Sequence, residues 1–392
     1  MSKKKNLGQY FTPTLIAQSL VEQFTLPIKQ VLELGAGEGS LGKALIHSHP
    51  NATYIGVEKD PETAQKCQNS LIDQKIITAD VLNESHEAWL NDIDTVDTIL
   101  GNPPFIETNL TLNTSALLSR QFPGFKLRTK KARAELLFLA HSLNKLKLNG
   151  QASFILPEIF FTSEIYRDFR RSLLLNFSDI SVLELPETIF QGIEVNTCIL
   201  SFTKTKSKNS SVWLGKLDAS GLITHRLKIN VENAITRMDF NFHNLLSTKG
   251  FDPENNIVTL QSIGTMLKRG SGSKTAIKDK ALHYFHTTSF PKSSQSIRLG
   301  NQRVDHFRYA EAGDILIPRV GSRCLEKQVL VESGQRTITD CIYQLKVPEQ
   351  YIDQVLRTLD SDFGKAWRKH NAKGSCAKYL TNSSLLHMPL VN

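Results

Sequence analysis

Apolar runs alternate with stretches of helical spacing through the first half of the chain. Apolar residues keep helical spacing over residues 14–24, 134–147 and 163–175, and a further helix is expected from about residue 41. The runs at residues 30–34, 54–57, 76–77, 96–100, 152–156, 180–185 and 196–202 suit buried strands. This order of strands and helices predicts an α/β fold built on a doubly wound, Rossmann-like sheet.

The start of the first helix has a capping pattern. Thr12 precedes Pro13, and proline is favoured at the first helical position because its missing N–H is not needed there. A threonine in front of it can accept a hydrogen bond from a backbone N–H of the first turn. The sequence therefore predicts Thr12 as the N-cap and Pro13 as the first helical residue.

Candidate ligand-binding residues follow the first three predicted strands. Residues 33–39 read Glu-Leu-Gly-Ala-Gly-Glu-Gly, a turn that lets a nucleotide-like ligand approach the backbone closely. Glu58 ends the second strand, 23 residues after Gly35, where a carboxylate can accept hydrogen bonds from ribose hydroxyls. Asp80 follows the third strand and can accept a hydrogen bond from an adenine amino group. As a single aspartate, Asp80 also suits a helix cap.

The fourth strand runs into Gly-Asn-Pro-Pro-Phe at residues 101–105. Two consecutive prolines remove two backbone N–H donors and fix φ, so the turn is stiff and presents carbonyl oxygens without local donors. The side-chain oxygen of Asn102 and the carbonyl oxygen of Pro103 can accept both hydrogens of an exocyclic amine, while Phe105 stacks on the ring that carries it. The alternative is a plain Pro-Pro loop with Phe105 in the core.

In this order the motifs resemble the S-adenosylmethionine-dependent DNA adenine-N6 methyltransferases of the gamma class. The matching segments are Gly-Gln-Tyr-Phe-Thr-Pro (8–13), Glu-Leu-Gly-Ala-Gly-Glu-Gly (33–39), Gly-Val-Glu-Lys-Asp (56–60), Ala-Asp-Val-Leu (79–82) and Gly-Asn-Pro-Pro-Phe (101–105). The resemblance covers residues 6–205 motif by motif and extends more loosely beyond them. It implies a Rossmann-like methyltransferase sheet followed by an α+β target-recognition domain, with S-adenosyl-L-methionine as cofactor and no metal.

The resemblance also assigns roles to residues. The implied cofactor-binding residues are Thr12, Glu33, Gly35, Ala36, Gly37, Glu58, Asp80 and Asn102. Thr12 and the backbone of residues 35–37 would hold the methionine part, Glu58 the ribose and Asp80 the adenine. The implied catalytic residues are Asn102, Pro103, Pro104, Phe105 and Phe190. Phe190 matches an aromatic residue that closes the second face of the extruded base, and ordinary core packing is its alternative.

Charge divides the chain into two parts. Residues 1–205 hold 20 Lys and Arg against 22 Asp and Glu, a net charge of −2, whereas residues 206–392 hold 27 against 16, a net charge of +11. Residues 204–211 have the polar composition of a linker. We therefore predict a catalytic domain over residues 1–205 and a DNA target-recognition domain over residues 212–392. The basic excess of the second part favours a polyanionic partner.

Two groups of basic residues are candidates for contacts with phosphates. The stretch 107–131 lacks clear periodicity and is predicted as a loop near the active-site mouth, with a plain solvated loop as the alternative. In the second half, the candidates for phosphate or guanine contacts are Lys268, Arg269, Lys274, Lys278, Arg319, Arg323 and Lys327.

The implied partner is double-stranded DNA, on which the chain is expected to act as a monomer. A cognate restriction endonuclease acting on the same site is a further candidate partner. The five cysteines are widely spaced and form no C-x-x-C pair, which suits a reducing cytoplasm. No apolar run approaches the roughly 20 residues that cross a bilayer, so no membrane association is expected. The expected activity is methylation of the N6 amine of a flipped adenine by the modification enzyme of a restriction-modification system.

Other functions share part of this pattern. Asn-Pro-Pro followed by an aromatic residue also occurs in RNA and protein-glutamine methyltransferases, but the segment at 8–13 and the basic second half disfavour them. Cytosine-N4 methyltransferases usually carry Ser where this chain has Asn102. A non-catalytic DNA specificity module is disfavoured by the intact set of Gly35, Glu58, Asp80 and Asn102.

Overall fold

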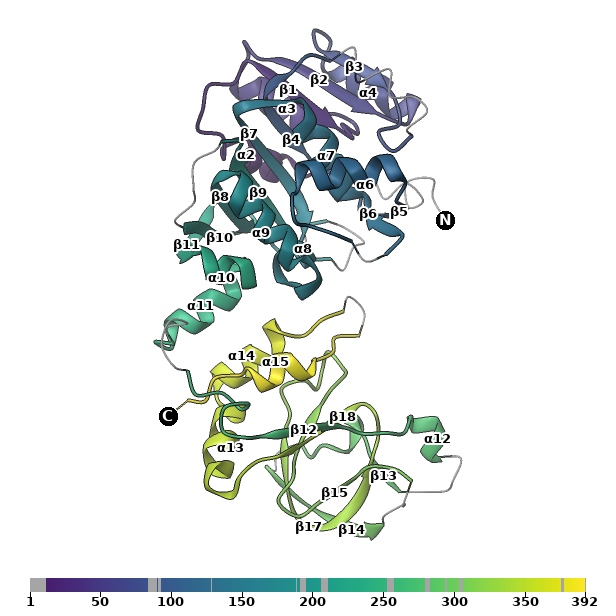
Figure 1. Cartoon of the computed structure of the whole chain (residues 1–392), viewed down its shortest axis with the longest axis vertical. Helices are drawn as coiled ribbons and strands as arrows, with labels where there is room; N and C mark the ends of the chain where they lie inside the picture. Colours follow the sequence, from purple (N-terminus) through teal and green to yellow (C-terminus); the bar gives the residue numbers. More distant parts are fainter. Residues whose placement is uncertain are drawn as a thin grey trace. The chain divides into compact units, whose positions relative to one another are not determined.

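The computed structural model describes residues 12–83, 90, 93–127, 129–187, 189–190, 195–205, 211–251, 257–278, 283–292, 295–302, 306–374 and 377–391. The chain forms two units, Met1–Phe240 and Asn241–Asn392 (Figure 1). Within the described residues, no helix is both long enough and apolar enough to cross a membrane.

A nine-stranded sheet forms the centre of the first unit, with the strand order β11-β10-β8-β9-β7-β4-β1-β2-β3. Strands β3, β2, β1, β4 and β7 pair in parallel, β9 runs antiparallel between β7 and β8, β10 is parallel to β8, and β11 is antiparallel to β10. The strands are β1 (Gln30–Leu34), β2 (Thr53–Glu58), β3 (Lys75–Thr78), β4 (Val96–Gly101), β7 (Leu146–Pro157), β8 (Ser178–Glu184), β9 (Thr197–Thr203), β10 (Ser211–Leu217) and β11 (Ile223–Asn230).

Helices cover both faces of this sheet, which confirms the doubly wound α/β fold. Adjacent strand residues enter opposite cores: Val31 and Leu100 pack on one face, and Leu32 and Ile99 on the other. Burial on both faces explains why these strands read as continuous apolar runs. The first face carries α2 (Thr14–Val21), α3 (Ser40–Ser48) and α4 (Pro61–Ser70), and the second carries α6 (Leu112–Gln121), α7 (Ala134–Lys145), α9 (Arg167–Asn176) and α10 (Val231–Thr236).

The stretch predicted as a loop at residues 107–131 is ordered as a hairpin that carries a helix. Strands β5 (Glu107–Asn109) and β6 (Lys131–Arg133) pair antiparallel, and α6 connects them. Thr111 caps α6 by accepting a hydrogen bond from the backbone N–H of Thr114, and Leu117 is buried on its inner side. The loop prediction was wrong because one cap and a few apolar positions outweighed the basic residues around them.

The domain boundary predicted at residues 204–211 was also wrong. Residues 206–210 lie outside the described residues, but β9 before them and β10 after them belong to the same sheet, on either side of β8. The polar segment therefore connects two strands of one unit, and that unit ends only at Phe240. With this boundary, residues 1–240 hold 26 Lys and Arg against 25 Asp and Glu, and residues 241–392 hold 21 against 13. The basic excess still lies in the second unit.

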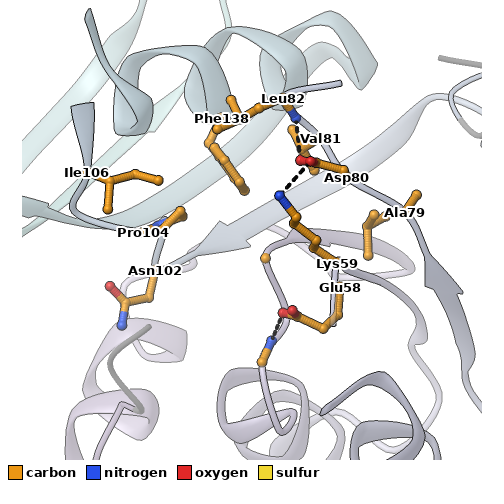
Figure 2. A pocket seen from close by; sticks show the side chains of 13 residues that line it. Glu58, Lys59, Ala79, Asp80, Val81, Leu82, Asn102, Pro104, Ile106 and Phe138 are labelled. Carbon is orange, nitrogen blue, oxygen red and sulfur yellow. Dashed lines mark hydrogen bonds and ion pairs between the residues drawn. The ribbon is translucent and has the colours of Figure 1, made fainter. Parts of the chain in front are cut away.

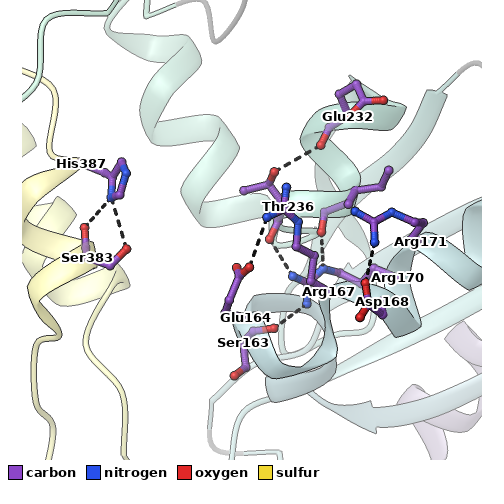
Figure 3. A network of polar contacts seen from close by, with 11 residues as sticks. Ser163, Glu164, Arg167, Asp168, Arg170, Arg171, Glu232, Thr236, Ser383 and His387 are labelled. Carbon is purple, nitrogen blue, oxygen red and sulfur yellow. Dashed lines mark hydrogen bonds and ion pairs between the residues drawn. The ribbon is translucent and has the colours of Figure 1, made fainter. Parts of the chain in front are cut away.

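Arg170 joins the end of the first unit to its body (Figure 3). This fully buried side chain donates to Phe160 O at 3.0 Å and Ser163 O at 2.9 Å, around α8 (Ile159–Thr162). It also donates to Ile235 O at 3.0 Å and Thr236 O at 2.7 Å, at the carboxyl end of α10. Burial lowers the pKa of Arg170 to about 10, so the side chain stays charged at neutral pH. The short 3-10 helix η2 (Glu164–Tyr166) lies between α8 and α9.

The second unit combines a seven-stranded sheet with helices, in agreement with the predicted α+β fold. Strands β12-β18-β16-β17-β13 lie in that order, and β14 and β15 also pair with β17. Ile315 and Ile317 pack against the helical side, whereas Leu316 enters a second small core. The strands are β12 (Met266–Arg269), β13 (Tyr284–Phe285), β14 (Ser296–Gln302), β15 (Tyr309–Glu311), β16 (Ile315–Pro318), β17 (Val329–Ile338) and β18 (Ile342–Lys346). The helices are α11 (Phe240–Thr248), α12 (Lys274–Lys278), η3 (Thr287–Ser289), η4 (Glu349–Tyr351), α13 (Ile352–Asp360), α14 (Asp362–His370) and α15 (Asn382–Leu386).

Candidate active site

A pocket opens at the carboxyl ends of β1, β2, β3 and β4 (Figure 2). Parallel neighbouring strands end at the same edge of a sheet, so residues far apart in the sequence meet there. Figure 2 shows Asn102, Pro104 and Ile106 on one side of the pocket and Glu58 and Asp80 on the other. The complete lining is Gly35, Gly37, Val57, Glu58, Lys59, Ala79, Asp80, Val81, Leu82, Asn102, Pro104, Ile106 and Phe138.

The glycine-rich turn shapes this pocket without aiming N–H groups into it. Gly35 has φ +79°, and a Cβ at this position would lie 3.1 Å from Cε1 of Phe138. The N–H groups of Gly35 and Ala36 both donate to the carbonyl oxygen of Val57, at 2.8 and 2.9 Å, and Ala36 is buried. The turn therefore offers a close backbone surface to a ligand.

Glu58 is held by the backbone from two sides. Its Oε2 accepts a hydrogen bond from the N–H of Gly37, and its Oε1 accepts one from the N–H of Asp60, each at 2.9 Å. Each carboxylate oxygen has two lone-pair sites. The carboxylate at the pocket wall is thus oriented by the protein and retains the capacity to accept hydrogen bonds from a ligand.

Asp80 carries an ion pair that the sequence did not indicate. Lys59 Nζ lies 2.8 Å from Asp80 Oδ2, and the N–H of Leu82 donates to Asp80 Oδ1 at 3.0 Å (Figure 2). Lys59 directly follows Glu58 and also lines the pocket. The pocket wall therefore carries two carboxylates, Asp80 with an ion pair to Lys59 and Glu58 with two backbone N–H donors.

Thr12 contacts Asn102 and does not cap the first helix. Helix α2 begins at Thr14, Pro13 precedes it, and no side chain caps its N-terminus, so the predicted capping role was wrong. Thr12 is buried, and its Oγ1 accepts a hydrogen bond from Asn102 Nδ2 at 3.0 Å. This bond turns the amide nitrogen of Asn102 towards Thr12 and its oxygen the other way. Thr12 itself is not part of the pocket lining.

The two prolines after Asn102 differ in their carbonyl contacts. Pro104 O accepts a hydrogen bond from the N–H of Ile106 at 3.1 Å, so the expectation that both carbonyls lack a local donor was wrong for Pro104. Pro103 O accepts no hydrogen bond from any residue that the structure describes. Phe105 and Phe190 meet edge to face, with ring centroids 6.4 Å apart and an angle of 83° between the rings. Phe190 is buried, and a base stacked between the two rings requires one of them to turn.

Glu33 lies behind the glycine-rich turn and does not line the pocket. Its buried carboxylate accepts a hydrogen bond from the hydroxyl of Tyr54. Burial raises the pKa of Glu33 well above its usual range, and the hydrogen bond from Tyr54 opposes this rise. Glu33 thus supports the turn from within the core.

A second buried carboxylate lies at the start of α7. Glu135 is fully buried, and its Oε1 accepts a hydrogen bond from Arg133 Nε at 3.0 Å. Among the described residues, no group donates to its Oε2. Burial raises the pKa of Glu135 to about 7 despite the charge of Arg133. Phe138, which lines the pocket, lies three residues further along the same helix.

The residues that sequence reasoning missed in this pocket are mostly apolar. Phe138, Ile106 and Val81 form walls, and Lys59 pairs with Asp80. Phe138 falls in a helix that the sequence predicted, but which residue of that helix faces the pocket depends on how α7 packs on the sheet. A flat apolar wall together with two carboxylates suits a ligand with an aromatic base and hydroxyl groups, such as a nucleoside.

Comparisons with known proteins agree with this arrangement. The family described as N-6 DNA Methylase matches residues 1–256. Type II methyltransferase M.HincII of Haemophilus influenzae is 25% identical over 213 residues, which cover 53% of this chain and 39% of that protein. Ribosomal RNA small subunit methyltransferase A of Chlorobium chlorochromatii is 28% identical over 152 residues, covering 36% of this chain and 57% of that protein. The chain thus spans less than half the length of M.HincII.

A solved structure extends the comparison of folds to both units. The type IIG restriction endonuclease BpuSI aligns with 99% of this chain and 60% of its own, at a TM-score of 0.53 and 13% sequence identity. That likeness concerns the fold, whereas the family match covers nearly two thirds of the sequence and includes every residue of the pocket. The chain therefore belongs to the N-6 DNA Methylase family.

Proposed function

We propose that this chain is an S-adenosyl-L-methionine-dependent DNA methyltransferase that methylates the N6 amino group of an adenine extruded from duplex DNA. One observation carries the proposal: Asn102 and Pro104 line the same pocket as Glu58 and Asp80. The residue proposed to accept hydrogen bonds from the amine and the residues proposed to hold a nucleoside cofactor thus line one pocket. The family match supports the same reaction.

The pocket residues fit this cofactor. Glu58 offers oriented carboxylate oxygens to the two ribose hydroxyls, and Phe138 with Ile106 and Val81 provides apolar contact for the adenine ring. Asp80, paired with Lys59, offers an acceptor to the adenine amine. Gly35 and Gly37 line the pocket without side chains, which allows the methionine part to approach the backbone closely. The bound cofactor supplies an electrophilic methyl group on a positively charged sulfur.

Asn102 and Pro103 activate the amine of the target base. The lone pair of an adenine amino nitrogen is delocalised into the ring, so the nitrogen is a poor nucleophile. When Asn102 Oδ1 and Pro103 O accept its two hydrogens, the nitrogen becomes pyramidal and its lone pair turns towards the methyl group. The same oxygens stabilise the positive charge that develops as the N–C bond forms. After transfer, the methylated nitrogen releases one proton to solvent.

Phe105 and Phe190 hold the extruded base. Extrusion costs a few kcal/mol of lost stacking and pairing, which new stacking contacts offset. In the free protein the edge of one ring packs against the face of the other, so this contact must open before a base can stack between them. The two rings therefore separate when the base enters.

Both units contribute basic surface for DNA. The second unit carries the larger excess, 21 Lys and Arg against 13 Asp and Glu, and the proposal assigns to it the recognition of the target sequence. In the first unit, exposed Lys130 and Lys131 lie on the β5–β6 hairpin, which starts two residues after Phe105. We assign to these lysines the phosphates that flank the target base. The chain acts as a monomer on DNA and protects the site of a cognate restriction endonuclease.

Labelled methyl transfer tests the proposal directly. The full chain is incubated with methyl-labelled S-adenosylmethionine and a mixed-sequence duplex, and the DNA is then digested to nucleosides for mass spectrometry. N6-methyldeoxyadenosine is expected with the wild type and is absent with Asn102→Ala. N4-methyldeoxycytidine, or label in none of the nucleosides, contradicts the proposal.

RNA is the second candidate substrate, because the ribosomal RNA methyltransferase of Chlorobium chlorochromatii matches 152 residues of the chain. A parallel incubation with structured RNA decides between them. If only the RNA becomes labelled, the substrate is RNA and not DNA.

A further inference from the structure

Three arginines gather around one tight turn of the second unit. The turn of residues 339–341 joins β17 to β18, and β12 and β16 flank β18 on either side. Both flanking strands run antiparallel to β18, with Arg269 opposite Tyr343 and Pro318 opposite Ile342. Arg269 and Arg319 therefore reach the same end of the sheet, beside Asp340.

Asp340 anchors two of these arginines through a single backbone oxygen. Its carbonyl accepts a hydrogen bond from Arg269 Nε at 3.0 Å and one from Arg319 Nε at 2.7 Å. Arg308 Nη1 donates in turn to the carbonyl of Arg269 at 2.8 Å. Among these contacts the single carboxylate is that of Asp340, which pairs with Arg269 at 2.8 Å. Three positive charges are thus concentrated around one negative charge, which suits an electron-rich ligand.

The scaffold under this cluster is closely packed. A Cβ on Gly270 would lie 2.1 Å from Thr339 O, so only glycine permits the approach of this segment to the turn. The N–H of Gly270 donates to Ile342 O at 3.0 Å, and the N–H of Asp340 donates to Gly272 O at 2.8 Å. The anchoring carbonyl therefore has a defined position, and so do the guanidinium groups that donate to it.

The three arginines differ in which guanidinium N–H groups remain available to a ligand. Arg269 uses Nε and Nη2 on Asp340, and Arg308 uses Nη1 on the backbone of Arg269. In the part of the chain that the structure describes, Arg319 donates through Nε alone, so both of its terminal NH₂ groups stay available. The backbone of Arg319 is held on both sides, because its N–H donates to Cys341 O at 2.8 Å and its carbonyl accepts from the N–H of Leu380 at 2.8 Å.

We infer that Arg319 reads a guanine in the recognised DNA sequence, donating from its two terminal NH₂ groups to O6 and N7; the inference rests on the proposed function. A held guanidinium fork matches two adjacent acceptors and discriminates against a base that lacks them. Arg269, which uses Nε and one terminal NH₂ group on Asp340, and Arg308, which uses one terminal NH₂ group on the backbone, lack the free pair of terminal groups and contact phosphates beside it. A phosphate contact for Arg319 itself is the competing outcome of the test.

The experiment compares the methylated motif of the full-length wild type with that of Arg319→Ala and Arg319→Lys on a randomised duplex library, read by sequencing of methylated adenines. Both variants are expected to lose preference for guanine at one position, by roughly 5- to 150-fold. Arg319→Lys keeps the charge but lacks the fork, so its salt dependence of DNA binding stays that of the wild type. Arg298→Ala is the matched control, since Arg298 is 83% exposed and paired with Glu332 in the same unit, and it keeps the wild-type motif.

Two results overturn the inference. One is an unchanged motif in Arg319→Ala. The other is binding weakened equally for all sequences, with a slope of log K against log salt lower by about 0.9, which makes Arg319 a phosphate contact. Failure of the proposed function looks different, because the wild type itself then leaves no methylated adenine in the library.

Discussion

The side chains of Thr12 and Asn102, 90 residues apart in the sequence, are joined by a hydrogen bond of 3.0 Å from Asn102 Nδ2 to Thr12 Oγ1. An asparagine amide presents an oxygen and a nitrogen at opposite edges, and only the oxygen can accept a hydrogen from a substrate amine. Thr12 decides which edge faces its own side. We propose that Thr12 influences methyl transfer through the orientation of Asn102, since Thr12 itself does not line the pocket.

Removing this acceptor should slow methyl transfer. Thr12→Val keeps the shape of the side chain but loses the hydroxyl, so we expect kcat to fall roughly 2- to 10-fold, the cost of one hydrogen bond. Thr12→Ser retains the hydroxyl and should restore the rate. Affinity for S-adenosylmethionine should remain that of the wild type. A weakened affinity with an unchanged kcat makes Thr12 a cofactor contact instead.

Replacing Glu58 should weaken cofactor binding. Glu58→Ala removes charge-assisted acceptors for the ribose and the acceptor of the Gly37 N–H, so the affinity should drop by at least about 1.5 kcal/mol, or more than tenfold. Isothermal titration calorimetry measures this directly. Glu62→Ala, an exposed change in the following helix, is the control and should bind normally. Equal affinities for the two variants exclude Glu58 from the site.

Phe190→Ala should weaken the trapping of the extruded base by roughly 1–3 kcal/mol, the range for stacking of a base on an aromatic ring. A fluorescent adenine analogue at the target position reports on this contact. Its emission should rise in the variant, since the quenching ring is gone. Emission identical to that of the wild-type complex assigns Phe190 to the core, where it packs against Phe105.

The hairpin lysines should contribute to the salt dependence of DNA binding. Lys130→Ala combined with Lys131→Ala should lower the slope of log K against log salt by about 1.8, which corresponds to two phosphate contacts. The matched control combines Arg226→Ala with Lys228→Ala on β11, an edge strand of the nine-stranded sheet, to which the hairpin does not belong. Its slope should equal that of the wild type. If the slope of log K against log salt is the same in both double variants, the hairpin lysines do not contact phosphates.

Glu135 should make stability depend on pH near neutrality. Its pKa is raised from 4.5 to about 7 in the folded protein, so the folded state holds a proton that the unfolded state has already lost in this range. Stability from this group therefore falls as pH rises from 4.5 to 7, by about 3 kcal/mol in total.

Glu135→Gln removes this dependence. The free energy of unfolding is measured in urea at pH 5 and pH 8 for both proteins. The variant's value minus the wild-type value should be larger at pH 8 than at pH 5. Glu107→Gln, an exposed carboxyl in the same segment, serves as the control. A constant difference between Glu135→Gln and the wild type across this range shows that the carboxyl titrates normally.

Much of the pocket could be predicted because its residues follow strand ends. Glu58 ends a strand, Gly35 and Asn102 directly follow one, and Asp80 lies two residues beyond one. Parallel pairing brings such positions to one edge. Contacts between side chains were not accessible in this way. The partner of Asp80, the acceptor for Asn102 and the orientation of Phe138 all depend on tertiary packing, which has no signature in local spacing.

The domain boundary shows a second limit of composition. A polar segment rich in Lys and Ser reads the same whether it links two domains or crosses over one strand within a sheet. What separates the two cases is the strand with which β10 pairs. That strand is β8, which ends at Glu184, and 26 residues lie between it and the start of β10 at Ser211. Pairing over such a distance leaves no trace in the segment itself.

The Arg170 contacts restrict where the second unit can be exchanged between relatives. A chimera joined within residues 206–210 takes β10, β11 and α10 from another protein, and the guanidinium of Arg170 then depends on foreign carbonyls at the positions of Ile235 and Thr236. A join after Phe240 keeps all four of its acceptors native. Chimeras that fold should therefore be those joined in α11 or beyond.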